Sequence, residues 1–239
     1  RTLDSGTMGG DTGSIFFLFM MLVVTFGGIF VVSALIGIIN NGLEDKLDEL
    51  RKGRSAVLEN DHTLILGWTP QIFTVISELV LANESRKSGA VIVILADQDK
   101  VEMEDAVNER VPDTKNTRVI CRSGSPIDLT DLEIASPHTA RSIIVLAEGT
   151  DPDMHVIKSV LAITNNPKRR SEPYHIVTQI HDPKNMGVVK MLGAKDNVQP
   201  ILTTDLIARV VAQTSRQSGL SIVYTELMNF GGDEIYFKQ

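Results

Sequence analysis

An uncharged apolar run from Ile15 to Ile39 is the feature that most restricts how this chain of 239 residues can fold. A helix rises 1.5 Å per residue, so this run reaches about 37 Å, whereas the hydrocarbon core of a bilayer is about 30 Å thick. The run is therefore long enough to span a membrane with some tilt, and it is too long for the apolar part of a signal peptide. We expect a transmembrane helix over residues 15–42.

Two adjacent glycines, Gly27 and Gly28, interrupt the middle of the run. A glycine pair weakens a helix enough to let it bend, and small side chains let a second backbone approach closely. Glycine is also commoner in membrane helices than in soluble ones. The pair is therefore either a gating hinge or an ordinary feature of a membrane span.

The charged flanks of the run predict its orientation. Arg1 alone is basic before the run, whereas four basic residues follow it closely: Lys46, Arg51, Lys52 and Arg54. Basic residues next to a membrane span stay on the cytoplasmic side. We therefore expect the rest of the chain on the cytosolic or nucleoplasmic side. A single cysteine, Cys121, fits such a reducing compartment.

The charged segment after the run predicts a connection to a second part of the chain. Leu43, Leu47 and Leu50 fall on one face of a short helix, so residues 43–60 are expected to form a linker helix. The linker is either a solvated connection or a lever that transmits force. The net charge of −7 argues against nucleic acid as a partner, because a phosphate-binding face needs an excess of lysine and arginine.

Residues 61–218 repeat an alternation of apolar strands and amphipathic helices. The predicted strands cover His62–Leu66, Val91–Leu95, Arg118–Cys121, Ser142–Leu146, His175–Ile180 and about Val198–Ile201. Most are continuous apolar runs, as in parallel strands that are buried on both faces. We therefore predict the α/β class, with a Rossmann-like doubly wound parallel sheet after the transmembrane helix. Residues 219–239 then begin a connection to a further lobe.

Four pairs of a capping residue and a proline stand close behind strands and predict helix starts. A capping oxygen accepts an unpaired helix N–H, and proline is tolerated at the first helical position. The pairs are Thr69-Pro70, Ser125-Pro126, Asp151-Pro152 and Asp182-Pro183.

The turn after the first strand departs from the dinucleotide-binding pattern. Gly67 is the sole glycine of G-x-G-x-x-G that survives, and Trp68 and Pro70 would crowd a pyrophosphate there. Asp97, which ends the second strand, is of the type that binds a ribose. A nucleotide would thus meet Gly67, Trp68 and Asp97, but we do not expect ordinary NAD binding.

Carboxylates near the second strand permit a regulatory calcium site. Asp97, Asp99 and Glu102 offer the oxygen ligands that calcium prefers, although they do not follow an EF-hand spacing. The alternative role of Asp97 and Asp99 is to cap the helix that follows. The five histidines show no metal-ligand spacing, and Cys121 at the end of an apolar strand is expected to be buried and inert. The sequence therefore predicts no catalytic residues and no enzyme.

The stretch from His175 to Ala212 resembles the second half of a TrkA-N or RCK domain, the cytosolic gating domain of potassium channels and transporters. The resemblance rests on Asp182-Pro183-Lys184-Asn185, Leu192-Gly193-Ala194 and Gln199-Pro200. A narrower resemblance, to the CASTOR/POLLUX family of ion channels, covers almost the whole chain. Its blocks are Leu50 to Ser55, His62 to Trp68, Ala82 to Ser85, Val119 to Pro126 and Ile144 to Glu148.

The CASTOR/POLLUX resemblance implies a homotetrameric cation channel in the nuclear envelope or in a bacterial plasma membrane. It implies that residues 1–14 end a pore loop, in which Asp4, Ser5, Gly6 and Thr7 look like the family's selectivity filter. Because this segment differs from the T-V-G-Y-G filter of potassium channels, the conducted ion, calcium or potassium, stays open. The chain is expected to be a fragment that does not conduct by itself.

Two alternatives come from other classes of protein. One is a nucleotide- or ion-binding regulatory subunit of a cation transporter, against which the apolar run counts. The other is a membrane-tethered NAD-dependent oxidoreductase, against which the altered glycine turn counts.

Overall fold

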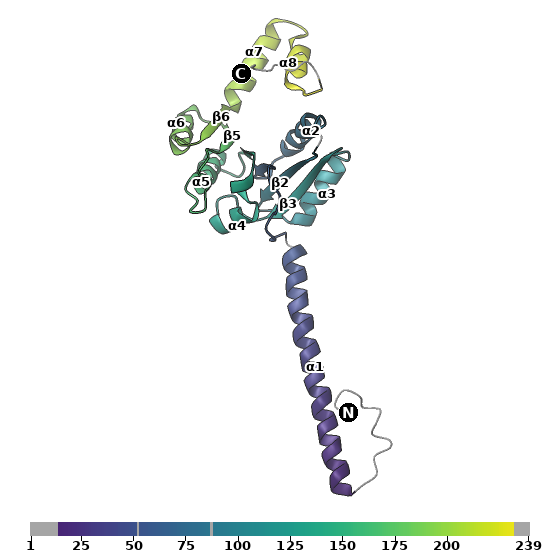
Figure 1. Cartoon of the computed structure of the whole chain (residues 1–239). Coiled ribbons are helices and arrows are strands. Elements are labelled where there is room, and N and C mark those ends of the chain that lie inside the picture. The colour runs from purple at the N-terminus through teal and green to yellow at the C-terminus, as the bar shows by residue number, and fades with distance from the viewer. Residues whose placement is uncertain (1–13, 52, 87, 232–239) are drawn as a thin grey trace. The chain divides into compact units, whose positions relative to one another are not determined.

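The computed structural model describes residues 14–51, 53–86 and 88–231. The chain divides into two compact units, Arg1–Leu50 and Arg51–Gln239, which are described separately (Figure 1).

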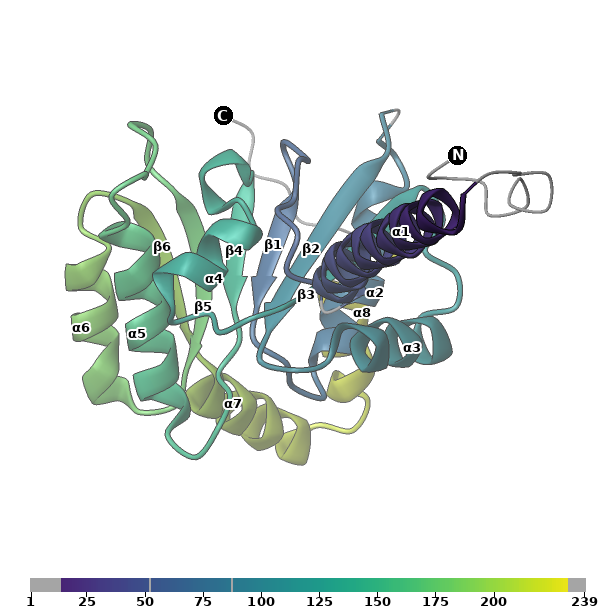
Figure 2. The same cartoon turned by 90° about the horizontal axis from the view of Figure 1, so that it is seen from below.

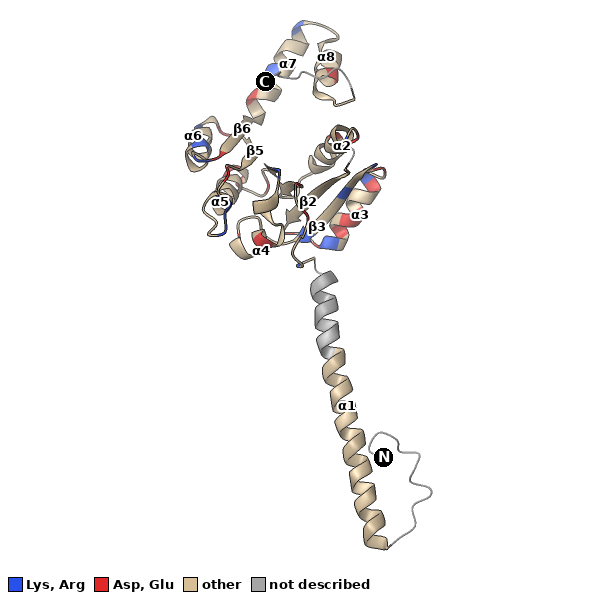
Figure 3. Cartoon of the chain, in the orientation of Figure 1, with Lys and Arg blue, Asp and Glu red and all other residues tan. Residues whose placement is uncertain are grey.

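Helix α1 runs from Ile15 to Arg51 without a break. Its stretch Ile15–Asn40 is long and apolar enough to cross a membrane, and it bears no charged side chain (Figure 3). Thr25 donates its hydroxyl to the carbonyl of Met21 at 2.8 Å, so this polar group is satisfied within the helix. The predicted linker is not a separate helix, because α1 continues through it to Arg51 and residues 53–62 are not helical.

A six-stranded parallel sheet forms the centre of the second unit, in the order β3-β2-β1-β4-β5-β6 (Figure 2). The strands are β1 (Thr63–Leu66), β2 (Ala90–Ala96), β3 (Thr117–Ser123), β4 (Ser142–Val145), β5 (His175–Ile180) and β6 (Asn197–Leu202). This order confirms the doubly wound prediction, and each predicted strand matches an observed one within two residues at either end. The order of the strands reverses between β1 and β4, whose residues Leu66 and Val145 are paired.

Helices cover both faces of the sheet. They are α2 (Ile72–Asn83), α3 (Lys100–Arg110), α4 (Leu129–Ile134), α5 (Pro152–Thr164) and α6 (Pro183–Leu192), with a short 3-10 turn η2 (Pro137–Thr139). Two further helices, α7 (Thr203–Arg216) and α8 (Leu220–Met228), follow the last strand.

Successive residues of a strand pack into two separate apolar clusters, one on each face of the sheet. Ile65 of β1 packs with side chains of α2 and α3, such as Ile76 and Met103. Its neighbour Leu64 packs on the other face with α5, where Val160 is fully buried. Burying an aliphatic side chain of this size stabilises the fold by about 1.5–3 kcal/mol, so the two clusters hold α2 and α3 on one face and α4, α5 and α6 on the other.

Two of the four predicted helix starts are confirmed. Asp151 accepts the N–H of Met154 at the start of α5, and Asp182 accepts that of Lys184 at the start of α6, each with proline in the first turn. Asp99 caps α3 by accepting the N–H groups of Val101 and Glu102, which is the alternative role predicted for it.

The other two predicted starts are wrong. Helix α2 begins after Gln71 with no side-chain cap, and the buried hydroxyl of Thr69 finds no partner among the described residues. Helix α4 begins at Leu129, where Asp128 supplies the cap in place of Ser125. In both cases the turn after the strand continues past the proline before the helix starts.

Candidate functional site

The crevice at the carboxyl ends of the strands is the candidate functional site of the α/β unit. A cavity of about 400 Å³ lies there, lined from the loops after β1, β2, β3 and β4 by Trp68, Asp97, Pro126 and Glu148, among others, and from α5 by His155. Doubly wound sheets bind ligands in this crevice, at the point where the strand order reverses.

Glu148, just after β4, is held by both oxygens of its carboxylate. Oε2 accepts the backbone N–H of Trp68 at 2.6 Å, and Oε1 lies 3.0 Å from Nε2 of His155 on α5. Burial alone would raise the pKa of Glu148, but the bonds from His155 and from the Trp68 N–H outweigh it and hold the pKa below its usual value. The crevice therefore contains a half-buried, ionised carboxylate.

Gly67 lets this carboxylate come close to the turn after β1. Its φ of +99° lies in a region that side chains disfavour. A Cβ at this position would lie 3.2 Å from Oε2 of Glu148 and 3.2 Å from the carbonyl oxygen of Leu146. The glycine is thus required by the backbone turn and by the close approach of the loop after β4.

Gln179 of β5 forms a second connection across the crevice. Its Oε1 accepts the N–H of Ala147 at 3.2 Å, and its Nε2 donates to Oε1 of Gln71 at 2.7 Å. Side chains from β4–α5 and from β5 therefore both bond to the turn that follows β1.

The structure brings together the three residues predicted to meet a nucleotide. Gly67, Trp68 and Asp97 all lie at this crevice, and Asp97 is exposed. Sequence reasoning missed Glu148 and His155 as members of the site. A carboxylate two residues after a predicted strand was the available signal for Glu148, because strand ends share one edge of the sheet.

The predicted calcium ligands are not gathered into one group. Oδ1 of Asp99 accepts the N–H groups of Val101 and Glu102 at 2.8 and 3.2 Å, and the side chain of Glu102 is on an exposed part of α3. Over the described ranges, no three His, Cys, Asp or Glu side chains lie close enough to hold a metal ion. Calcium binding by Asp97, Asp99 and Glu102 stays a prediction.

The predicted pore and hinge residues lie in the first unit. Asp4, Ser5, Gly6 and Thr7 are outside the described residues. Gly27 and Gly28 lie within the continuous helix α1, and a Cβ on Gly27 would meet no atom of the described residues within 4 Å. Hinge bending at this pair stays a prediction.

The chain's single cysteine is buried, as expected. Cys121 of β3 is 1% exposed, and burial, with a smaller effect of Glu104, raises the pKa of its thiol to about 12. A thiol in this state is neutral at physiological pH and unreactive.

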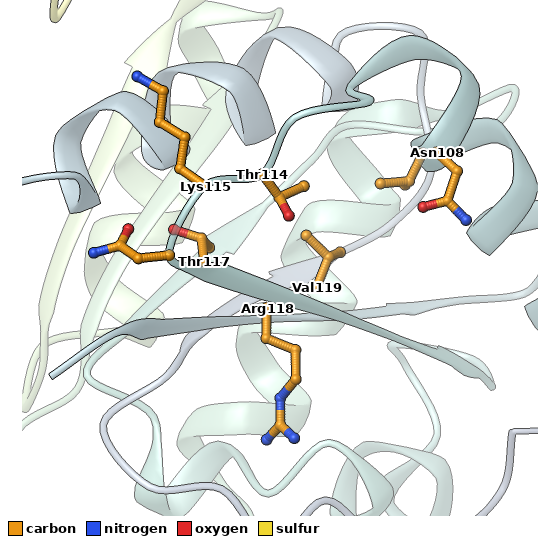
Figure 4. Close-up of a pocket in the computed structure, with 8 residues that line it drawn as sticks. Asn108, Thr114, Lys115, Thr117, Arg118 and Val119 are labelled. Atoms are coloured by element: carbon orange, nitrogen blue, oxygen red, sulfur yellow. The ribbon is translucent and has the colours of Figure 1, made fainter.

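A shallower hollow of about 430 Å³ lies along β3, away from the crevice (Figure 4). Thr114, Thr117 and Val119 line it, while Lys115 and Arg118 point to opposite sides in the figure. Lys115 pairs with Glu84, and Arg118 pairs with Glu59. Both cations of this hollow are therefore engaged with carboxylates of neighbouring segments.

The fold and the apolar helix define a class of protein: a helix long and apolar enough to span a membrane, followed by a doubly wound α/β domain. The solved structures that it resembles include the GsuK channel and the human SLO3 gating ring, each at 20% identity and a TM-score of 0.47. The matches cover 84% and 74% of this chain, and 33% and 31% of those chains.

Comparison with relatives gives the family. The chain is 37% identical over 219 residues to the ion channel CASTOR of Lotus japonicus and 34% identical over 221 residues to a probable ion channel POLLUX of Arabidopsis thaliana. A family profile described as "Castor and Pollux, part of voltage-gated ion channel" matches residues 204–239. The chain belongs to the CASTOR/POLLUX family of ion channels.

The matches cover 90% and 91% of this chain, which spans about a quarter of the length of these relatives, 25% and 26%. Because the family is one of ion channels and not of enzymes, the oxidoreductase alternative is set aside.

Proposed function

We propose that this chain is part of a cation-channel subunit, in which α1 is the inner helix of the pore and the α/β unit controls its opening. The observation that carries the proposal is helix α1, which runs unbroken from an uncharged apolar stretch to Arg51, where the α/β unit begins. Most side chains of Ile15–Asn40 are exposed within the chain, so lipid and other subunits must cover them. A homotetramer is the arrangement implied by the family.

The segment Asp4 to Thr7 is proposed as the selectivity filter. An acidic ring that four copies of Asp4 contribute would concentrate cations at the pore entrance, whichever ion passes. Gly27 and Gly28 would let the inner helix bend, because a glycine pair weakens a helix.

Gating by a ligand is the second element of the proposal. A ligand in the carboxyl-edge crevice, or between neighbouring α/β domains, would open the pore to the extent that it binds the open form more tightly. Calcium, bound through Asp97, Asp99 and Glu102, is the proposed ion. A regulatory subunit of a transporter would use the same ligand without conducting.

The proposed location places the α/β unit on the cytosolic or nucleoplasmic side of a bacterial plasma membrane or a nuclear envelope. Basic residues support this orientation, because Lys46, Arg51, Lys52 and Arg54 follow the span closely.

Single-channel recording tests the proposal with the longest natural chain that carries this sequence. The protein, reconstituted in a planar bilayer, should pass cation current, and Asp4→Asn should lower the unitary conductance. Asp11→Asn removes the same charge seven residues along the chain and is the matched control. The absence of cation current at every calcium concentration would contradict the channel assignment. Equal conductance of Asp4→Asn and Asp11→Asn would contradict the filter assignment.

A further inference from the structure

The crevice holds one of the chain's own carboxylates at the turn where Rossmann-like domains bind a phosphate. In those domains the turn after the first strand presents backbone N–H groups to a pyrophosphate. Here the N–H of Trp68 in this turn donates to Oε2 of Glu148 at 2.6 Å. We propose that Glu148 is a built-in substitute for a ligand phosphate and closes the crevice to phosphorylated nucleotides.

The position of the Glu148 carboxylate is fixed, because each of its two oxygens has a partner. The Trp68 bond is short for an N–H···O bond, as charge-assisted bonds are. The second oxygen lies 3.0 Å from Nε2 of His155, and both side chains are 19% exposed. His155 is therefore a positioning residue that keeps the carboxylate over the turn.

The carboxylate also fills the space that the glycine turn leaves open. In a dinucleotide binder the first glycine provides a tight turn and the next ones let the backbone approach the pyrophosphate. Here the nearest groups to the missing Cβ of Gly67 are Oε2 of Glu148 and the carbonyl of Leu146, each at 3.2 Å. A phosphate at this turn would have to displace Glu148 or lie beside its negative charge.

The hydrogen bonds of Gln179 also help to hold the crevice in this arrangement. Gln179 bonds to both Ala147 and Gln71, so it joins the loop after β4 to the start of α2 across the reversal point. Asp97 adds a further carboxylate to the rim. The carboxylates of Glu148 and Asp97 would thus repel an anionic ligand in the crevice. An uncharged nucleoside would not meet this repulsion.

Binding of ADP and of adenosine to the detergent-solubilised full chain tests the proposal by calorimetry. The wild type should bind ADP no more tightly than adenosine. Glu148→Ala frees the Trp68 N–H and removes the charge, so its ADP affinity should rise about tenfold or more, with adenosine affinity unchanged. Glu148→Gln keeps an acceptor for Trp68 but loses the charge, so a smaller rise is expected.

Glu133→Gln is the matched control. Glu133 on α4 is likewise a partnered carboxylate, bonded to Asn166 Nδ2 at 2.7 Å and to Lys168 Nζ at 3.3 Å, and it does not line the crevice. The ADP affinity of the Glu133→Gln variant should equal that of the wild type. The proposal is overturned if wild type and Glu148→Ala bind ADP within about twofold of each other, or if adenosine gains as much as ADP. Should Glu148→Ala fail to fold, Glu148→Gln decides by the same criterion.

Discussion

The carboxylate of Asp153 and the backbone nitrogen of His181 lie 2.8 Å apart, which ties α5 to the turn between β5 and α6. The same carboxylate accepts the N–H of Asp182 at 2.9 Å and a side-chain N–H of Asn185 at 2.8 Å. Asp153 is 5% exposed, so this one buried side chain organises the start of α6.

Replacing Asp153 should destabilise the α/β unit. Asp153→Ala leaves the part-buried backbone N–H groups of His181 and Asp182 without this acceptor, so we expect a loss of about 2 kcal/mol in the free energy of unfolding. Asp153→Asn retains one acceptor oxygen and should lose less. Urea unfolding of the two variants beside the wild type measures both effects, and an Asp153→Ala variant as stable as the wild type would contradict this role.

Acid should remove the advantage that Asp153 confers. Burial would raise the pKa of Asp153, but bonds from Asn185, Asp182 and His181 outweigh it and hold the pKa below its usual 3.8. Because the folded value is depressed, the stabilisation is complete above that usual value and is lost as the pH falls through the folded pKa. The stability difference between wild type and Asp153→Asn should be constant from about pH 7 to pH 5 and should shrink below about pH 4. Thermal melts across this range check the sign, and a difference that grows in acid would contradict it.

Two glycines of the same region should respond in opposite directions to alanine. A Cβ on Gly193, which caps α6, would lie 2.0 Å from Cγ2 of Val198 on β6, so Gly193→Ala should cost about 1–3 kcal/mol through overpacking. Gly187 lies inside α6, and no atom of the described part of the chain lies within 4 Å of its added Cβ, so Gly187→Ala should raise the free energy of unfolding by about 0.5–1 kcal/mol. Denaturant midpoints of both variants test the pair, and equal shifts would be inconsistent with this packing.

Cys121 should report unfolding of the sheet. Its buried thiol has a pKa of about 12, so a thiol-specific reagent should label the native chain at least about a hundredfold more slowly than the denatured chain. Since the sequence contains one cysteine, the whole signal belongs to β3. Labelling of the native protein at the rate of the denatured one would show that the strand opens freely.

The strands could be predicted from the sequence because continuous apolar runs record burial on both faces. The start of α2 could not, because a proline after Thr69 is compatible with a turn as well as with a first helical position. The Glu148–Trp68 contact was also out of reach, because the two residues are 80 positions apart and only the sheet order places their loops together. Asp97 could be located at the crevice because it follows a predicted strand by two residues and the carboxyl ends of parallel strands share one edge of the sheet.

Helix α1 has a mechanical consequence through its 37 residues of uninterrupted helix. A continuous helix transmits torsion as well as tension, since each residue fixes a rotation of about 100° along with a rise of about 1.5 Å. Inserting one residue after Gly42 would lengthen the rod very little but turn its two ends by about 100° relative to each other. An insertion in this helix therefore changes the rotation of one end relative to the other far more than it changes the distance between them.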